Sequence, residues 1–365
     1  MSDLQGVVIE RVDRALADQW CSAAAVVVLH EGRTLARHGA GVLASTGPDP
    51  SGPSPTGVPL EATEPADVLT WFDLASVTKV FSAVTLLTLV ERGALDLDAS
   101  VAEHLPPFAE GERSRVTLRM LLSHTSGLPA TWMGWFGRIG APREDLLADL
   151  LATPLEAPPG TRWNYSCVGY NTAMALAETA TGRRWAELLG SLVLEPMGLT
   201  EGVAFSPAGP VAATEYQPEF DRGVVQGVVH DEASWSLGGE CANAGLFATA
   251  DALAHFARAI RTGELPCDNA PLLANALPGI LGRALADPAQ MPWGHSLGLR
   301  IGQDWMGDSS ALGHTGFTGT SVMIHPPLGL DVVVLANRVH PRRSEEQVHR
   351  LREEISRAAI EAVAR

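Results

Sequence analysis

Basic residues are scarce in this chain of 365 residues. Its 26 lysines and arginines are outnumbered by 42 aspartates and glutamates, which gives a formal net charge of −16. Such a negative field repels phosphate backbones and anionic lipid, so we expect neither nucleic acid nor a membrane among the partners. No run approaches the ~20 apolar residues that span a bilayer, and no basic leader with an apolar core opens the chain. These absences predict a cytoplasmic protein.

Cysteines are few as well, and their spacing carries no metal or redox motif. Cys21, Cys167, Cys241 and Cys267 form no Cys-x-x-Cys pair. No cluster of histidine, aspartate and glutamate has the spacing of metal ligands either. We therefore expect free thiols in a reducing compartment, no metal and no cofactor.

Hydrophobic residues, by contrast, make up 46% of the chain and charged residues only 19%, which is typical of a globular protein with a sizeable core. Alternating or β-branched runs predict strands near both ends of the chain, and leucine-rich segments predict helices in its middle. The predicted strands are Ala23–His30, Thr34–Val42, His295–Gly302, Thr320–His325 and Asp331–Asn337, and the predicted helices include 118–122, 144–152, 168–181, 184–194, 250–262 and 345–365.

This order of elements predicts a fold of the α/β (α+β) class. Residues 1–75 and 290–365 are expected to form an antiparallel sheet flanked by helices and built from both termini. Residues 76–289 are expected to form a mainly helical domain inserted between them. We expect the functional site at the seam between the two.

A Ser-x-x-Lys sequence, formed by Ser76 and Lys79, stands at the start of a predicted helix. Residues three apart share a helix face, so the lysine amine can approach the serine hydroxyl. A serine hydroxyl needs a base to become a nucleophile, and a partly buried lysine can lose its proton near neutral pH. The tetrapeptide alone is weak evidence, because a capping serine followed by an exposed lysine gives the same pattern.

Two further motifs follow in order along the chain, Tyr165-Ser166-Cys167 and His314-Thr315-Gly316. The ordered triplet resembles that of the serine β-lactamases and penicillin-recognising DD-peptidases, in the Tyr-x-Asn and His-Thr-Gly versions of the class C-like branch. The segments Leu121–Leu128 and Leu237–Thr249 are similar to the same family, and the resemblance extends from about residue 20 to residue 340. It implies a β-lactamase-like fold and places the chain near the family VIII-type esterases or a related intracellular serine hydrolase.

The resemblance also implies roles for the catalytic residues. Ser76 attacks a carbonyl and becomes acylated. Lys79 and Tyr165 share the proton transfers that activate Ser76, protonate the leaving group and later activate water. The backbone N–H of Ser76 and that of Phe317 or Thr318 form the oxyanion hole.

His314 stands in place of the lysine found in many related sequences. With Thr315 it is expected either to bind a substrate carboxylate or to polarise Tyr165. Gly316 completes the motif at the edge of the site.

Four other residues are candidate substrate contacts. Cys167 stands where family members often have an asparagine whose amide binds substrate amides; a thiol is a weak donor, so amide recognition is expected to weaken by roughly 1–3 kcal/mol. Trp132 and Trp135 either form an apolar wall for an acyl or aryl group or pack between helices. His230 belongs to a segment that borders the pocket in similar sequences.

The leading hypothesis is an esterase that acts on a small-molecule acyl substrate through an acyl-Ser76 intermediate, with acyl transfer as a close variant. Cell-wall peptidases and β-lactamases work outside the cytoplasm, so the expected location favours an ester. A D-amino-acid peptidase, a DD-peptidase-like amidase or a β-lactamase is the alternative. A non-catalytic binding protein with the same fold is a third hypothesis, which the intact Ser76, Lys79 and Tyr165 disfavour.

Overall fold

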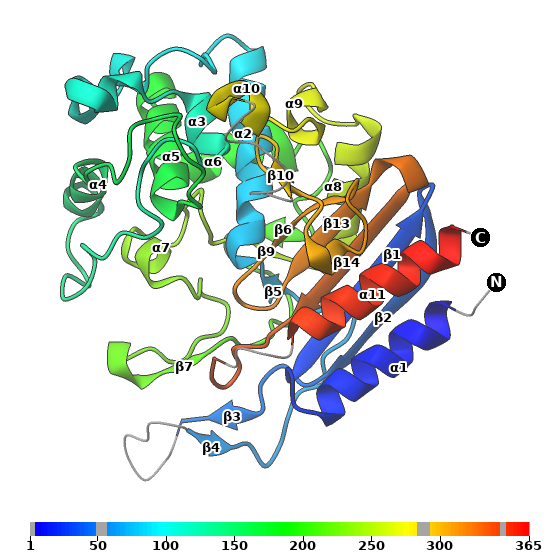
Figure 1. Cartoon of the computed structure of the whole chain (residues 1–365). Coiled ribbons are helices and arrows are strands. Elements are labelled where there is room, and N and C mark those ends of the chain that lie inside the picture. Colours follow the sequence, from blue (N-terminus) through cyan, green and yellow to red (C-terminus); the bar gives the residue numbers. More distant parts are fainter. Residues whose placement is uncertain (1–3, 49–56, 283–292, 344–347, 365) are drawn as a thin grey trace.

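The computed structural model describes residues 4–48, 57–282, 293–343 and 348–364. A seven-stranded antiparallel sheet lies at its centre (Figure 1). In order across the sheet, its strands are β10 (Gly294–His295), β11 (Arg300–Ile301), β12 (Leu312–Thr315), β13 (Ser321–His325), β14 (Leu330–Ala336), β1 (Ala23–His30) and β2 (Arg33–Gly41). The pairing of β1 with β14 runs from Ala24 opposite Ala336 to His30 opposite Leu330. The expected antiparallel sheet built from both ends of the chain is therefore confirmed.

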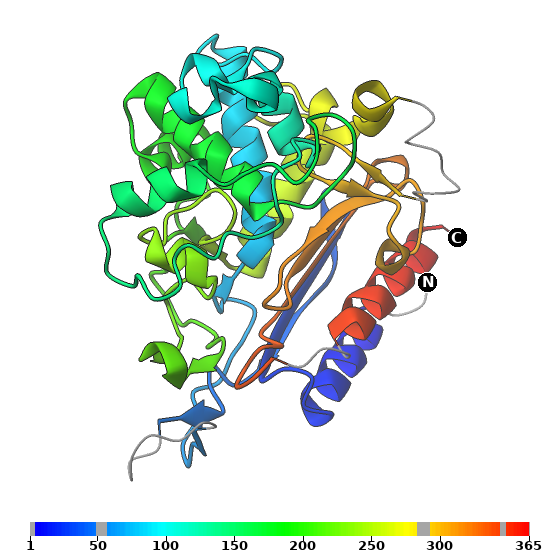
Figure 2. The same ribbon diagram turned by 60° about the vertical axis from the view of Figure 1, so that its left-hand side comes forward.

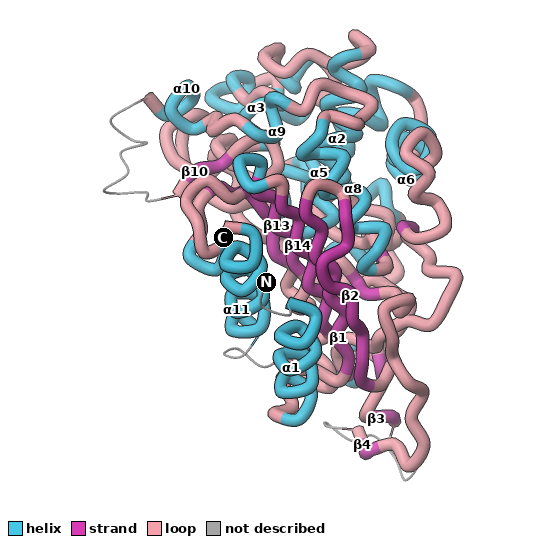
Figure 3. Tube along the Cα trace, turned by 90° about the vertical axis from the view of Figure 1, so that its right-hand side faces the viewer, coloured by secondary structure: helices cyan, strands magenta, loops and turns pink. Residues whose placement is uncertain are grey.

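Strand β1, which lies between β14 and the edge strand β2, is buried on both faces of the sheet. Successive side chains of a strand point to opposite faces, so Val26 and Val28 pack toward one layer of helices while Ala25 and Val27 pack toward the other. The outer layer consists of α1 (Leu4–Ala17) and α11 (Val348–Val363), which lie side by side on the sheet (Figures 2 and 3). The sequence of a strand that is covered on both faces is a continuous apolar run, and that of β1 is such a run.

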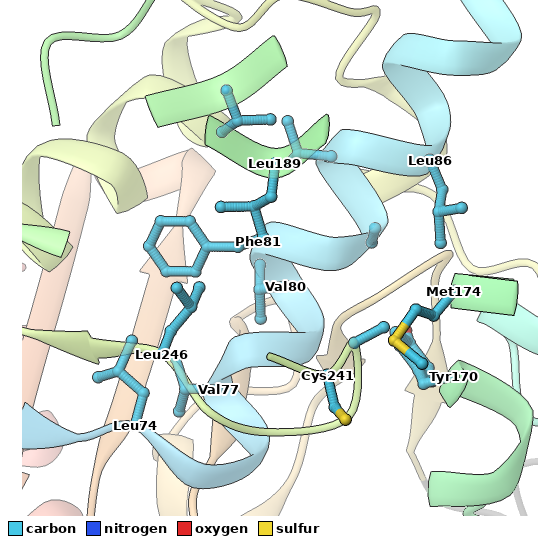
Figure 4. Packing of buried hydrophobic residues seen from close by; sticks show 14 of the residues in the cluster. Leu74, Val77, Val80, Phe81, Leu86, Tyr170, Met174, Leu189, Cys241 and Leu246 are labelled. Atoms are coloured by element: carbon cyan, nitrogen blue, oxygen red, sulfur yellow. The ribbon is translucent and has the colours of Figure 1, made fainter. Parts of the chain in front are cut away.

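On the inner face lies the helical part of the molecule, with α8 (Ala250–Thr262) against the sheet and α2 (Thr78–Glu91) beyond it. Every residue of α2 from Thr78 to Leu89 is buried, which marks it as a central helix. The ring of Phe81 on α2 stacks on that of Phe256 on α8, with centroids 3.7 Å apart. Figure 4 shows apolar side chains packed around α2. Helix α8 lies within the range 76–289 that was expected to form the helical domain, and it packs directly on the sheet.

Shorter elements complete this side of the molecule, and α3 to α6 and α8 coincide with predicted helices. The remaining elements are α3 (Leu118–Leu122), α4 (Arg143–Leu151), α5 (Cys167–Thr181), α6 (Trp185–Leu189), α7 (Glu232–Ser236), α9 (Ala270–Leu273), α10 (Leu277–Leu281), β3 (Thr46–Gly47), β4 (Val58–Pro59), β5 (Phe72–Asp73), β6 (Val203–Ala204), β7 (Tyr216–Gln217), β8 (Gly223–Val224) and β9 (Phe247–Ala248). None of the helices in the described ranges has both the length and the apolar character needed to cross a membrane.

One predicted strand is wrong. Residues 295–302 form two short strands, β10 and β11, separated by a turn. Ser296 closes this turn, because its hydroxyl accepts the Leu299 N–H at 3.0 Å. Gly298 adopts φ 131° there, and a Cβ at this glycine would lie 2.7 Å from the Ala83 side chain on α2. Of the predicted helix 345–365, residues 348–363 form α11, while 345–347 and 365 lie outside the described residues.

Candidate active site

Ser76 lies in the 3₁₀ turn Ala75–Val77, between β5 and α2. The turn opens with Ala75 in the left-handed region at φ 45°, which is uncommon for a residue with a side chain. Asp73 stabilises this conformation, since its Oδ1 accepts the Ala75 N–H at 2.7 Å. Its Oδ2 accepts the His230 N–H at 2.6 Å. Asp73 therefore shapes the turn that presents Ser76.

The loop between β12 and β13 is hydrogen-bonded to the residues that precede this turn. The hydroxyl of Thr318 donates to the Asp73 carbonyl at 2.7 Å, and that of Thr320 donates to the Leu74 carbonyl at 2.9 Å. Gly316 approaches so closely that a Cβ there would lie 2.4 Å from Leu74 O. Glycine at this position lets the end of β12 lie directly beside the turn that carries Ser76.

A cavity of 330 Å³ contains Ser76 in its wall. Phe317 also lines this cavity, whereas Thr318 is buried outside it. Among the described residues, nothing accepts a hydrogen bond from the backbone N–H of Ser76 or Phe317. These two N–H groups can therefore serve an oxyanion, and the position of Phe317 favours it over Thr318. The cavity is lined by Ser76, Tyr165, Cys167, Asp231, Arg300, Thr315, Gly316, Phe317, Arg338, His349 and Arg352.

Lys79 extends from the first turn of α2 and is fully buried. Its Nζ donates to Ser76 Oγ at 3.1 Å, to Asn243 O at 2.9 Å and to Cys167 Sγ at 3.4 Å, which uses all three hydrogens of an ammonium. Burial opposes the charged form of Lys79, but electrostatic interactions with Cys167 and Tyr165 and a hydrogen bond with Tyr165 outweigh burial, so the pKa of Lys79 is raised overall. The resting Lys79 is thus an ammonium, and not the neutral base that its sequence context allowed.

Tyr165 lies beside this pair, just before α5. The centre of its ring is 5.0 Å from Lys79 Nζ, 4.9 Å from the guanidinium carbon of Arg300 and 4.5 Å from the ring of His124. Ser166 caps the N-terminus of α5 with its hydroxyl, which fixes the backbone next to Tyr165. The structure therefore brings the tyrosine of the second motif to the serine and lysine of the first.

Three buried histidines, His124, His295 and His314, cluster beside Tyr165. His314 and His295 each donate from Nδ1 to the carbonyl of the following residue, at 2.9 and 2.6 Å. His124 Nδ1 instead accepts the Ser166 N–H at 3.0 Å. Because a carbonyl only accepts and an N–H only donates, these bonds fix the neutral tautomers. Nε2 is an acceptor in His314 and His295 and a donor in His124.

Burial keeps all three histidines neutral at pH 7. It lowers the pKa of His314 and of His124 well below the usual value, aided by neighbouring positive charge, and lowers that of His295 to about 3. His314 is fully buried and lies outside the residues that line the Ser76 cavity. Of its two expected roles, contact with Tyr165 fits this position, whereas binding a substrate carboxylate does not.

Trp132 and Trp135 line a second cavity, of 110 Å³, next to the first. Cys167 lines both cavities and connects them. Trp132 Nε1 donates to Asp149 Oδ2 at 2.8 Å, which fixes its ring. Both tryptophans are therefore placed to form an apolar wall near the site, as well as being packed against helices.

His230 does not reach either cavity among the residues described. Its Nε2 pairs with Glu215 Oε2 at 2.9 Å, and its ring stacks on Phe317 with centroids 5.7 Å apart. Glu215 carries a pKa lowered to about 2: burial opposes this shift, but its hydrogen bonds, including that to His230, outweigh burial. The structure therefore places His230 behind Phe317 as a support, not as a substrate contact.

Sequence reasoning missed the basic end of the cavity, which Arg300, Arg338, His349 and Arg352 line. The Nε atoms of Arg300 and Arg352 are buried without a hydrogen-bond partner among the described residues. Burial and the nearby Arg338 and Arg300 lower the pKa of Arg352 to about 9, so it remains a cation at neutral pH. A signal for Arg352 was present, because it follows Val348 by four residues on the predicted inward face of the last helix.

Comparison with known proteins yields related enzymes over most of the chain. The family model described as Beta-lactamase matches residues 8–356. Esterase EstB of Burkholderia gladioli is 28% identical over 385 residues, covering 90% of this chain and 89% of the esterase. The N-acetylmuramyl-L-alanine amidase of Bacillus subtilis (strain 168) is 28% identical over 304 residues, covering 74% of this chain and 68% of the amidase. The structure of EstCE1, a hydrolase with promiscuous acyltransferase activity, is similar in fold, with a TM-score of 0.73, 21% identity and 98% of both chains covered.

Proposed function

Because the chain belongs to the beta-lactamase family, we propose that it is a serine hydrolase that cleaves a small-molecule ester through an acyl-Ser76 intermediate. Transfer of the same acyl group to an alcohol or amine is the close variant. The observation that carries the proposal is the 3.1 Å contact between Lys79 Nζ and Ser76 Oγ in the wall of a cavity that Tyr165 also lines. The similarity to an esterase over 90% of the chain supports it.

The geometry assigns the proton transfers as follows. Lys79 is an ammonium that stabilises Tyr165 as a phenolate. This phenolate takes the proton of Ser76 as Ser76 Oγ attacks the ester carbonyl, and it becomes a neutral phenol. The carbonyl oxygen becomes an oxyanion that accepts hydrogen bonds from the N–H groups of Ser76 and Phe317. Tyr165 then returns the proton to the departing alkoxide. Water repeats the sequence on acyl-Ser76, and releases the acid and the free serine.

Cys167 favours esters over amides as substrates. Its thiol contacts Lys79 Nζ at 3.4 Å, in the place where the asparagine of related sequences contacts the lysine. A thiol binds an amide more weakly than a carboxamide does. An ester needs no such contact, since it has no N–H to satisfy. Amide hydrolysis, which the name of the similar amidase indicates for that protein, is the second candidate.

A substrate panel tests this proposal. We expect p-nitrophenyl esters to be turned over at least about a hundredfold faster, in kcat/KM, than a chromogenic cephalosporin or a D-Ala-D-Ala peptide. The measurement is initial rate against substrate concentration for each compound with one enzyme preparation. Cleavage of the peptide with no turnover of the esters would reverse the assignment in favour of the amidase. Inertness toward all of them would favour a binding protein.

The basic end of the cavity indicates an anionic leaving group. The guanidinium of Arg300 lies over the ring of Tyr165. Because Tyr165 protonates the departing oxygen, the leaving group must lie beside Tyr165, and therefore on the side of the cavity that Arg300 lines. Arg300 and Arg352 both line the cavity, and the Nε atom of each is buried without a hydrogen-bond partner among the described residues. Guanidinium groups bind carboxylates with strong charge-assisted hydrogen bonds.

Replacing Arg352 with glutamine is expected to slow an ester with an anionic leaving group selectively. The acetyl ester of 3-hydroxybenzoate should lose roughly tenfold in kcat/KM, mostly through KM, while phenyl acetate loses much less. Arg350→Gln is the matched control, because Arg350 is an exposed arginine on the same helix. Equal losses on both esters would show that Arg352 acts through packing and not through charge recognition.

We also propose that the enzyme works in the cytoplasm. The four cysteines are all free thiols, and three of them are buried. Free thiols are usual in a reducing compartment. Cell fractionation that recovered the protein outside the cytoplasm would contradict this location.

A further inference from the structure

Asp231 is a carboxylate at the junction of the two cavities. It lines both the 330 Å³ cavity of Ser76 and the 110 Å³ cavity of Trp132 and Trp135. Its Oδ1 accepts the Ser234 N–H at 2.7 Å, as the N-cap of α7, and is 3.4 Å from the side-chain nitrogen of Asn243. These bonds to Oδ1 fix the orientation of the carboxylate.

No hydrogen bond or ion pair reaches the second oxygen of Asp231, Oδ2, from any residue in the described ranges. Lys79 and Arg222 interact electrostatically with Asp231, but they donate their hydrogen bonds to other groups. Lys79 bonds Ser76, Cys167 and a carbonyl. Arg222 donates to the carbonyls of His230 and Val229 and to a glutamine side chain. Asp231 is thus a carboxylate that the fold orients, and no described side chain forms a hydrogen bond with its second oxygen.

The position of Asp231 relative to Tyr165 identifies which half of the substrate it meets. Tyr165 protonates the leaving group, and the guanidinium of Arg300 lies over its ring. The leaving group therefore occupies the arginine end. Asp231 instead shares the second cavity with Cys167 and the two tryptophans, so it faces the acyl group. A carboxylate held beside an apolar wall is the arrangement that recognises an ammonium group next to a hydrocarbon side chain.

We propose that Asp231 binds an ammonium group on the acyl half of the substrate, so that the enzyme acts on aminoacyl esters whose compact apolar side chain enters the cavity of Trp132 and Trp135. This inference rests on the proposed esterase function and narrows its substrate class. Asp231 Oδ2 accepts the ammonium hydrogens, while the ester carbonyl lies against Ser76. The second cavity is small, which favours side chains of a few carbons.

The test compares two esters of the same shape and the same leaving group. Alanine and isobutyrate differ only in that an ammonium group replaces a methyl group. A difference in turnover between their p-nitrobenzyl esters therefore reports the effect of the positive charge. The assay is run at mildly acidic pH, where the amine is a cation. The wild type is expected to prefer one enantiomer of the alanyl ester over the isobutyryl ester by roughly tenfold or more in kcat/KM. Asp231→Asn should lower that preference by roughly tenfold. Asparagine also caps helices, so α7 should be retained.

The controls separate charge recognition from general damage. Asp145→Asn, at an exposed acid on α4, should leave the preference as it is in the wild type. On the unaltered enzyme, acetylating the alanine nitrogen removes the charge without any mutation and should remove the preference. Equal turnover of the alanyl and isobutyryl esters by the wild type would overturn this inference alone. Turnover of neither ester would overturn the esterase proposal, and this inference with it.

Discussion

Ser76→Ala is expected to lower ester turnover by a factor on the order of 10⁴ to 10⁶. Alanine removes the oxygen that forms the bond to the acyl group and that accepts a hydrogen bond from Lys79 Nζ at 3.1 Å. The protein should still fold, because Ser76 is only partly buried and its side chain caps no helix. The measurement is kcat/KM for a p-nitrophenyl ester, corrected for spontaneous hydrolysis.

The oxyanion hole does not involve the serine side chain, so it accounts for the residual rate expected of Ser76→Ala. The N–H groups of residue 76 and Phe317 remain in the variant, so a substrate analogue that resembles the tetrahedral intermediate should still bind. A boronate, which needs the serine oxygen for its covalent bond, should lose most of its affinity. Turnover by Ser76→Ala within tenfold of the wild type would disprove the assignment of the nucleophile.

Tyr165→Phe is expected to reduce kcat by about a thousandfold on alkyl esters. The substitution removes only the hydroxyl, so the contacts of the ring with Lys79, His124 and Arg300 persist. Esters of nitrophenol should lose less than alkyl esters, because nitrophenolate leaves without protonation. The measurement is the slope of log kcat against leaving-group pKa, which should steepen in the variant.

Tyr170→Phe is the matched control, since Tyr170 lies on α5 with its ring 5.6 Å from Lys79 Nζ. Its hydroxyl donates to the carbonyl of Leu122 at 3.2 Å, so its removal leaves a buried acceptor unpaired. That loss should cost about 1–3 kcal/mol in the free energy of unfolding and little in kcat. Equal kcat for Tyr165→Phe and the wild type would show that another group carries the protons.

Local patterns were sufficient to predict the framework of this molecule. The strand Ala23–His30 was predicted with the bounds it has in the structure, because an uninterrupted apolar run is bounded by turns on both sides. The helices that follow were equally visible from leucine spacing. The split between β10 and β11 was missed, since it depends on the Ser296 turn and on the contact of Gly298 with α2, neither of which a residue pattern reveals.

The motif residues were predictable, whereas their electrostatic states and their partners were not. The positions of Ser76, Lys79 and Tyr165 followed from ordered motifs, but the charge of Lys79 depends on Cys167 and Tyr165, which meet it only after folding. His314 could be named, yet its neutral state results from complete burial. Arg300 comes to the cavity from β11, and no local spacing predicts such a residue. Asp231 follows His230 in the segment that was expected to border the pocket, but it is Asp231 and not His230 that lines the cavity.

The most direct test of the account is the mass of the enzyme after an acid quench during turnover of a slow ester. We expect an increase equal to the acyl group less one hydrogen, located by peptide mapping on Ser76, and its absence in Ser76→Ala. Cys167→Ala should still carry the adduct on Ser76, although Cys167 contacts the same Lys79 amine. An adduct on Cys167, or steady turnover of the ester by Ser76→Ala with no adduct on the wild type, would contradict the acyl-Ser76 mechanism.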